Sequence, residues 1–110
     1  MRQEFPNTLL IADTATWDNV KEASNLGFDI IGTTMHGYTP DSEGLNIADN
    51  DFEYLKDVLK VAKDKVIAEG KIDTPKKAKR CIDLGCHGVV VGGAITRPQQ
   101  IATKFVNALN

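Results

Sequence analysis

Two carboxylates stand at corresponding places beside apolar segments of the sequence. Asp13 directly follows the segment at residues 8–12, and Glu69 closes the segment at residues 65–69. Burying a carboxylate among apolar side chains is costly unless the group has a partner or a function. Each acid is therefore predicted to act as a general acid or base, or to accept hydrogen bonds from sugar hydroxyl groups. The alternative is that each caps a helix or fixes a loop through a salt bridge.

Two glycines and an arginine at the end of the last apolar segment favour anion binding. In the stretch VVVGGAITRP, Gly92 and Gly93 leave backbone N–H groups accessible, and Arg97 adds a guanidinium group near a helix start. Gly70 allows a ligand the same close approach next to Glu69. We expect Gly70, Gly92, Gly93 and Arg97 to bind a phosphate group. The alternative is a tight turn with a solvated arginine.

Hydroxyl groups and an imidazole follow the apolar segment at residues 28–32. Thr33 and His36 are predicted to contact the same substrate, and a histidine there could also transfer a proton. The alternative for His36 is an ordinary surface or hydrogen-bonding residue. The polar loop from Thr39 to Asn50 is long enough for a lid, and a plain surface excursion explains it equally well.

The elements that must position these residues alternate between strands and helices. Four apolar, β-rich runs are predicted strands, and each is followed by a helical pattern: residues 8–12, 28–32, 65–69 and 88–92. This alternation is typical of crossover units around a parallel sheet. Residues 1–110 are therefore predicted to form a single α/β domain, a (βα)4 half of a TIM barrel. A small doubly wound open sheet is the alternative.

Capping residues set the bounds of two predicted helices. One begins at Thr16 and ends at Gly27, and another begins at Thr74, with Pro75 in its first turn, and ends at Gly85.

Two further helices are predicted from their apolar stripes. The second helix is capped by Asn50 or Asp51, and the fourth begins at Pro98. The side chains predicted to face inward from the four helices are Val20, Ala23, Phe52, Leu55, Leu59, Ala62, Ala78, Cys81, Ile82, Ile101, Phe105 and Leu109.

Four parallel strands do not close a barrel, so one face of the predicted sheet lacks helices. Leu9, Ile11, Ile67 and Val90 are predicted to point from that face. An uncovered apolar patch of this size predicts a partner, either a second copy in a homodimer or a separate N-terminal half-barrel.

Composition narrows the classes of partner. Thirteen basic and fifteen acidic side chains in 110 residues give a net charge of −2, which favours neither nucleic acid nor a membrane surface. No apolar run matches a membrane helix or a signal peptide, so we expect a cytoplasmic protein. Cys81 and Cys86 do not have the spacing of a redox pair or a metal site and are predicted to be buried thiols.

Five motifs together resemble one enzyme family. The segments ADTAT, GFDIIGTTMHGYT, FEYLKDVL, KVIAEGKIDTP and GVVVGGAITRP are similar to the C-terminal half of bacterial N-acetylmannosamine-6-phosphate 2-epimerases. The resemblance implies a TIM-barrel isomerase that interconverts N-acetylmannosamine 6-phosphate and N-acetylglucosamine 6-phosphate in sialic acid catabolism, without a metal or an organic cofactor. A proton leaves C2 and another returns on the opposite face, which calls for two proton-transferring groups.

The resemblance also implies residue roles. Glu69 corresponds to a catalytic glutamate, Asp13 would hold or polarise the sugar, and Arg97 with the amides of Gly92 and Gly93 would bind the 6-phosphate. The catalytic lysine of the family has no counterpart here, so this chain alone is expected to lack the full proton-transfer apparatus. The alternatives are a non-catalytic phosphate-binding half-barrel or truncated fragment that self-associates, and another phosphate-sugar barrel enzyme.

Overall fold

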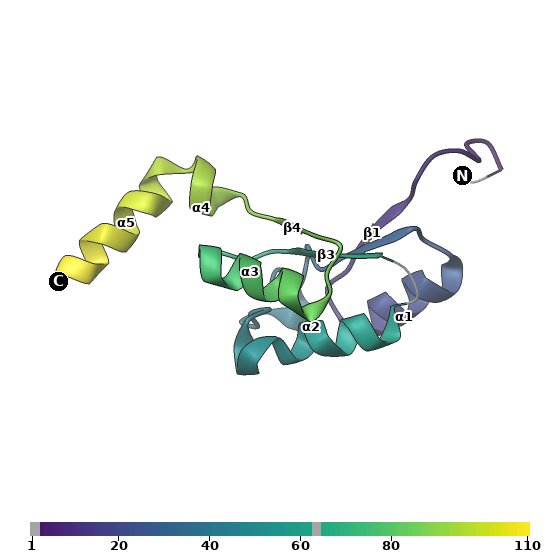
Figure 1. Ribbon diagram of the computed structural model, residues 1–110, viewed down its shortest axis with the longest axis horizontal. Helices are drawn as coiled ribbons and strands as arrows, with labels where there is room; N and C mark the ends of the chain where they lie inside the picture. Colours follow the sequence, from purple (N-terminus) through teal and green to yellow (C-terminus); the bar gives the residue numbers. More distant parts are fainter. Residues whose placement is uncertain (1–2, 63–64) are drawn as a thin grey trace.

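Four short parallel strands form one sheet in which chain order and spatial order agree. The computed structural model describes residues 3–62 and 65–110. The sheet has the order β1-β2-β3-β4 (Figure 1). Its strands are β1 (Ile11–Asp13), β2 (Ile30–Gly32), β3 (Lys65–Glu69) and β4 (Gly88–Val90). The four predicted segments are thus confirmed as strands of a parallel sheet, although three of them are shorter than expected.

The register of the sheet aligns the carboxyl ends of neighbouring strands. Asp13 pairs with Gly32, Gly32 pairs with Ile67, and Glu69 pairs with Val90. Because successive side chains alternate between the two faces, the side chains of Asp13 and Glu69 emerge on the same face of the sheet. This arrangement brings the two acids to one edge of the molecule.

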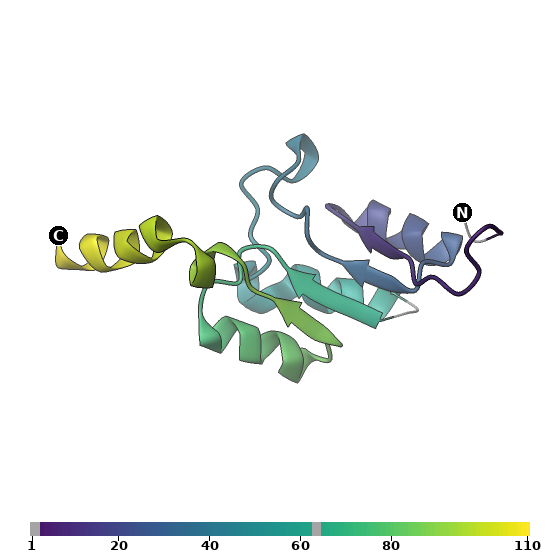
Figure 2. The same ribbon diagram turned by 90° about the horizontal axis from the view of Figure 1, so that it is seen from above.

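Three helices cover a single face of the sheet. The helices α1 (Trp17–Leu26), α2 (Asp49–Val61) and α3 (Pro75–Leu84) lie side by side on that face (Figures 1 and 2). A doubly wound sheet needs helices on both faces and a reversal of strand order, and neither is observed in the part of the chain that the structure describes. The half-barrel is therefore confirmed, and the doubly wound alternative is wrong.

Local capping explains where α1 and α3 begin and end. The Thr16 hydroxyl accepts a hydrogen bond from the Asn19 amide at 3.3 Å, and Thr74 caps α3 in the same manner. Gly27 and Gly85 end the two helices with φ angles of 83° and 112°, which residues with a Cβ rarely adopt. All four predicted caps are confirmed.

The start of α2 differs from its prediction. The helix begins at Asp49, before the expected caps Asn50 and Asp51, and residues 50–52 have φ angles between 54° and 60°. The reason is a turn that closes earlier in the chain. The Asp49 carboxylate accepts from the Asn46 amide at 3.0 Å, and the Asn46 side chain accepts from the Ala48 amide at 2.9 Å.

The core lies between the sheet and its three helices. Its fully buried side chains come from both layers and include Val20, Ile31, Leu55, Val58, Ala68 and Cys81. Cys81 and Cys86 are free, buried thiols, as predicted. Burial raises the pKa of the Cys86 thiol to about 11, so this side chain serves packing and not nucleophilic chemistry.

The opposite face of the sheet is apolar and open. Leu9, Ile11 and Val90 are 69%, 55% and 41% exposed, whereas Ile67 is half-buried. We call these four residues the inner face, because they would look into the centre of a closed barrel. The predicted exposure of apolar side chains on the sheet is confirmed.

The last helical segment corrects a prediction. The short helix α4 (Gly93–Thr96) precedes α5 (Pro98–Leu109), and α5 extends away from the sheet (Figures 1 and 2). Phe105 and Leu109, expected to be buried, are 70% and 86% exposed, and Ile101 is half-buried. The protruding helix raises the radius of gyration to 15.3 Å, against about 13 Å for a compact chain of this length.

One side chain of α3 and the character of the helices remain to be described. Ile82, expected to face inward from α3, is 45% exposed, because Cys81 occupies the inward position of that turn. Within residues 3–62 and 65–110, none of the helices combines the length and apolar character needed to cross a bilayer.

Candidate functional site

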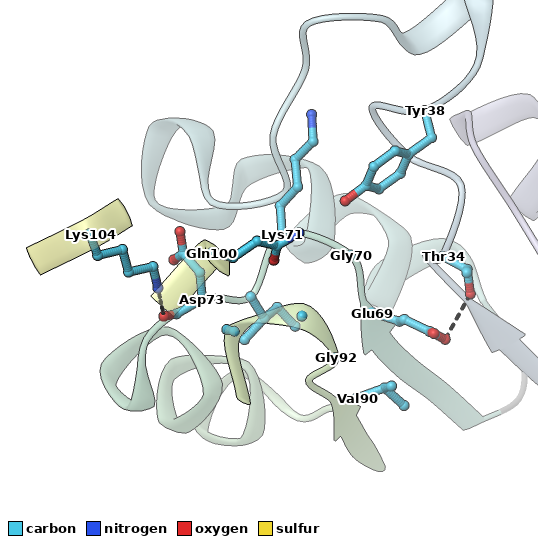
Figure 3. A pocket seen from close by; sticks show the side chains of 13 residues that line it. Thr34, Tyr38, Glu69, Gly70, Lys71, Asp73, Val90, Gly92, Gln100 and Lys104 are labelled. Carbon is cyan, nitrogen blue, oxygen red and sulfur yellow. Dashed lines mark hydrogen bonds between the residues drawn. The ribbon is translucent and has the colours of Figure 1, made fainter. Parts of the chain in front are cut away.

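A pocket opens at the carboxyl ends of β2, β3 and β4 (Figure 3). Its volume is about 410 Å³, and we call it the strand-end pocket. The residues that line it come from the ends of β3 and β4, from the loops after the three strands, and from α4 and α5, and they include Thr34, Glu69, Gly70, Lys71, Gly92 and Gly93. The carboxyl ends of parallel strands are where barrel enzymes place their active sites.

A single hydroxyl group joins the two predicted acids. The Thr34 hydroxyl oxygen lies 2.9 Å from the Asp13 carboxylate and 2.9 Å from the Glu69 carboxylate. Figure 3 shows the contact between Thr34 and Glu69 at the rim of the pocket. Asp13 itself lines a neighbouring depression beside α1 and is exposed. The structure therefore brings both acids together, with Thr34 between them.

Thr33 has a different position from its neighbour. It is fully buried, and its hydroxyl donates to the Glu69 carbonyl oxygen and accepts from the Glu69 amide, both at 2.9 Å. These two bonds join the ends of β2 and β3 and leave the hydroxyl outside the pocket lining. The geometry supports a structural role for Thr33 in place of the predicted substrate contact, and Thr34 is the threonine that faces the pocket.

The turn after Glu69 depends on two residues in the left-handed region. Gly70 and Lys71 have φ angles of 97° and 58°. A Cβ at Gly70 would lie 3.2 Å from the Thr34 carbonyl oxygen, so the glycine allows the two loops to approach. The Lys71 ammonium donates to the Leu45 carbonyl oxygen at 2.7 Å and lies 5.2 Å from the centre of the Tyr38 ring.

The glycine pair lies at the start of the short helix α4. Gly92 is the N-cap of α4, and the amides of Gly93 and Ala94 open its first turn, where helix geometry provides no acceptor within the helix. Both glycines line the strand-end pocket, as Glu69 does, and Gly92 is labelled in Figure 3. A phosphate site made by a loop after a late strand and a short extra helix is common in TIM barrels.

Arg97 does not join the glycines. It is exposed, it is the N-cap of α5, and it is absent from the lining of the strand-end pocket. The cause is α4, whose turn separates Gly93 from α5. The predicted phosphate contact of Arg97 stays a prediction, and its position in this structure does not support it.

His36 is placed away from the pocket. Its Nδ1 atom lies 2.8 Å from the Ala15 carbonyl oxygen, and its ring stacks on Tyr54 with centroids 3.7 Å apart. The side chain is only 5% exposed. These contacts support the structural alternative that the sequence left open for His36. Burial also raises the pKa of Tyr54 to about 12, so its hydroxyl stays protonated at neutral pH.

Several residues of the pocket were not among the predicted site residues. They are Thr34, Tyr38, Lys71, Asp73, Gln100 and Lys104. Thr34 had a usable signal, because alternation along the strand places it on the face opposite to Thr33. Lys104 had none, since it reaches the pocket only through the angle of α5, where its ammonium donates to the Asp73 carbonyl oxygen at 2.8 Å.

Metal binding would need a cluster of suitable ligands. Among the described residues, no three His, Cys, Asp or Glu side chains gather as a metal site requires.

Comparisons with known proteins cover nearly the whole chain. The family model described as "Putative N-acetylmannosamine-6-phosphate epimerase" matches residues 2–110. This chain belongs to the N-acetylmannosamine-6-phosphate epimerase family.

Individual relatives agree with the family match. The chain is 71% identical, over 99% of its length, to the "Putative N-acetylmannosamine-6-phosphate 2-epimerase" of Lactiplantibacillus plantarum. It is 67% identical, over 100% of its length, to the protein of the same description from Latilactobacillus sakei. It covers 48% of each of these two proteins, so the chain spans about half the length of the curated relatives it matches.

A solved structure supports the same conclusion about the fold. The N-acetylmannosamine-6-phosphate 2-epimerase from Clostridium perfringens superposes with a TM-score of 0.85 and 46% sequence identity. The alignment covers 96% of this chain and 45% of the clostridial chain. The (βα)4 unit therefore corresponds to about half of an epimerase of this family.

Proposed function

We propose that this chain supplies one proton-transferring group and the phosphate site of an N-acetylmannosamine-6-phosphate 2-epimerase, and that a second half-barrel completes the enzyme. The observation that carries the proposal is the position of Glu69. Glu69 lines the strand-end pocket together with Gly92 and Gly93, and its carboxylate points toward Thr34 at the rim (Figure 3). A sugar whose phosphate is held at the glycines would extend toward this carboxylate.

The proton chemistry assigned to Glu69 is a reversible deprotonation at C2. The carboxylate takes the C2 proton of the open-chain sugar, and the C2–H electron pair moves toward the C1 carbonyl oxygen to give an enolate. Return of a proton from the same carboxyl group restores the original configuration. Inversion needs a second group on the opposite face, and we propose that the partner half-barrel supplies it.

The anion site rests on backbone amides more than on side-chain charge. The amides that open α4 offer a positive partial charge to an incoming phosphate, and Gly92 leaves room for it, since nothing lies within 4 Å of where a Cβ would be. Lys104 adds an ammonium group to the lining of the same pocket. We therefore assign the 6-phosphate to the side of the pocket formed by Gly92 and Gly93.

A partner is proposed because the inner face is open. Exposed apolar side chains on a sheet are normally covered, and two copies of this chain would bury each other's inner face. A homodimer is our proposal for the chain as it stands, and a separate N-terminal half-barrel would cover the same surface. We further propose a place in sialic acid catabolism and, because the substrate is a charged sugar phosphate that a membrane retains, in the cytoplasm.

The test follows deuterium at C2 of N-acetylmannosamine 6-phosphate and N-acetylglucosamine 6-phosphate incubated with the purified chain in D2O. The proposal expects deuterium to enter one of the two sugars while its configuration is retained. Glu69→Gln should abolish exchange, whereas Glu43→Gln, an equal change at an exposed position in the loop before α2, should leave it unchanged. Full epimerisation by the chain alone would show that no second half-barrel is needed.

Two outcomes of the same experiment would contradict the proposed catalytic role. Binding of the sugar phosphate without deuterium exchange, measured by calorimetry on the same samples, would identify a non-catalytic phosphate-binding half-barrel. Exchange that persists in Glu69→Gln would remove Glu69 from the mechanism.

A further inference from the structure

We propose that Thr34 is a positioning residue that couples Asp13 to Glu69, so that the state of one carboxylate sets the hydrogen bonding of the other. The effect of Thr34 on turnover rests on the proposed function, whereas the coupling itself does not. The observation is the bridge already described, in which one hydroxyl oxygen lies 2.9 Å from each carboxylate.

The bridge has fewer protons than acceptors. A hydroxyl group carries one proton and can donate it to one oxygen at a time. With both carboxylates ionised, a bond donated to Asp13 therefore leaves Glu69 without the Thr34 proton, and the reverse also holds. A ligand that satisfies Asp13, such as a sugar hydroxyl group, releases the Thr34 proton to Glu69. Ligand binding at Asp13 thereby changes the hydrogen bonding of Glu69.

Backbone bonds on both sides fix the position of Thr34. The Thr33 hydroxyl ties the preceding residue to the end of β3, as described above. The Met35 amide donates to the Thr14 carbonyl oxygen at 3.1 Å and so ties the following residue to the end of β1. The backbone of Thr34 is therefore held between the two strand ends that carry Asp13 and Glu69.

The absence of a side chain at Gly32 leaves space beneath the bridge. A Cβ there would lie 3.1 Å from the Thr34 hydroxyl oxygen and 3.5 Å from the Asp13 carboxylate. Gly32 pairs directly with Asp13 in the sheet and precedes Thr34 by two residues, so it lies on the same face as both. The sequence thus provides both the bridging hydroxyl and the room for it.

The bridge also has a chemical consequence for Glu69. Thr34 contacts the Oε2 atom, which leaves Oε1 as the oxygen that takes and returns the C2 proton. A carboxylate held at one oxygen keeps its orientation through the reaction, which preserves the geometry that proton transfer needs. Thr34 does not itself exchange a proton with the sugar in this account.

The coupling is tested by 13C NMR of the full chain with labelled side-chain carboxyl groups. Asp13→Asn should shift the Glu69 carboxyl resonance in the wild-type background and in Thr34→Ser, which keeps the hydroxyl. In Thr34→Val, which keeps the shape and loses the hydroxyl, the same substitution should leave the Glu69 resonance in place. The resonance of Glu43, an exposed side chain in the loop before α2, is the internal control. An equal shift in the Thr34→Val background would overturn the coupling.

A kinetic measurement adds a readout that a merely structural role would not produce. Thr34→Val should lower kcat for C2 deuterium exchange by about tenfold or more, the loss expected for a hydrogen bond to a charged group, with KM changed by less than about threefold. Thr34→Ser should restore most of the rate. Far-ultraviolet circular dichroism and thermal melting establish that each variant is folded, and Thr34→Ala replaces Thr34→Val if the latter does not fold.

The outcomes separate this inference from the proposed function. If the wild-type chain shows no exchange while the NMR coupling depends on the Thr34 hydroxyl, the bridge stands and the catalytic proposal fails. If the wild-type chain exchanges deuterium and Thr34→Val is equally active without any change in coupling, the inference fails and the catalytic proposal stands.

Discussion

Thr33 and Glu69 are joined twice, because one hydroxyl both donates to the Glu69 carbonyl oxygen and accepts from the Glu69 amide, each at 2.9 Å. The hydroxyl is fully buried at the junction of β2 and β3. A backbone donor and a backbone acceptor of the catalytic candidate therefore depend on a neighbouring side chain. We call these two hydrogen bonds the Thr33 lock. The position of the Glu69 carboxylate depends on the Thr33 lock as well as on the sheet.

Thr33→Val is expected to destabilise the fold. The substitution keeps the shape of the side chain but leaves one buried N–H group and one buried carbonyl group without this partner, at a cost of about 2–4 kcal/mol in the free energy of unfolding. Urea denaturation at fixed protein concentration measures the loss. The control is Thr103→Val, the same change on the exposed surface of α5, for which a difference within about 0.5 kcal/mol is expected. Equal stabilities of the two variants would contradict the Thr33 lock.

Gly70→Ala is expected to cost more than Gly44→Ala. Both glycines have positive φ angles, 97° and 81°, so each alanine carries a backbone cost of about 1–2 kcal/mol. Only at Gly70 does the added Cβ meet another loop, at 3.2 Å from the Thr34 carbonyl oxygen, whereas nothing lies within 4 Å at Gly44. The difference between the two variants in urea denaturation reports the contact between the loops. No difference would mean that the loops separate freely.

The acid limb of the stability curve should depend on Asp51. Its hydrogen bonds with Arg80 and Lys56 lower its pKa from 3.8 to about 2. A depressed pKa in the folded state adds stability that is present above pH 3.8 and disappears as the pH falls toward 2. Because Asp51 is exposed, added salt should weaken the effect.

Asp51→Asn tests this dependence. Denaturation followed from pH 6 down to about 2 should show a shallower loss of stability in the variant than in the wild-type chain. Asp41→Asn, also on the exposed surface, is the control and should retain the slope of the wild-type curve. Identical slopes in Asp51→Asn and the wild-type chain would show that the ion pairs do not persist in solution.

The parts of the fold that local interactions decide could be predicted from the sequence. Thr16 and Gly27 cap a helix through contacts within a few residues, and both caps form as expected. The strands could be recognised because each lies in a short, continuously apolar, β-rich run, even though helices cover only one face of the sheet. The alternation of the two kinds of element predicted a parallel sheet, with the half-barrel favoured and a small doubly wound sheet as the alternative.

The features that depend on strand register, or on burial by residues far away in the sequence, could not be predicted. Alternation separates Thr33 from Thr34, but the two bonds between the Thr33 hydroxyl and Glu69 depend on the pairing of β2 with β3, which no single segment contains. The apolar stripe of α5 indicates that this helix packs against another apolar surface, but it does not indicate whether that surface belongs to the same chain. Phe105 remains 70% exposed. Arg97 was placed beside Gly93 for a similar reason, because the turn of α4 between them has no strong signal in the sequence.

The open inner face leads to a prediction about assembly. We expect the wild-type chain to self-associate at micromolar concentration, because burying apolar side chains such as Ile11 and Val90, which are 55% and 41% exposed, is favourable. Ile11→Glu and Val90→Glu should each weaken association at least about tenfold, since a carboxylate in an apolar interface is costly to desolvate. Leu26→Glu introduces the same charge at a position that is 68% exposed on the helical side of the sheet, and it should leave association unchanged.

Sedimentation equilibrium distinguishes the cases, and a monodisperse wild-type monomer would show that the inner face does not join two copies. Equal weakening by all three substitutions would indicate a general effect of charge, in which case the inner face is not the interface.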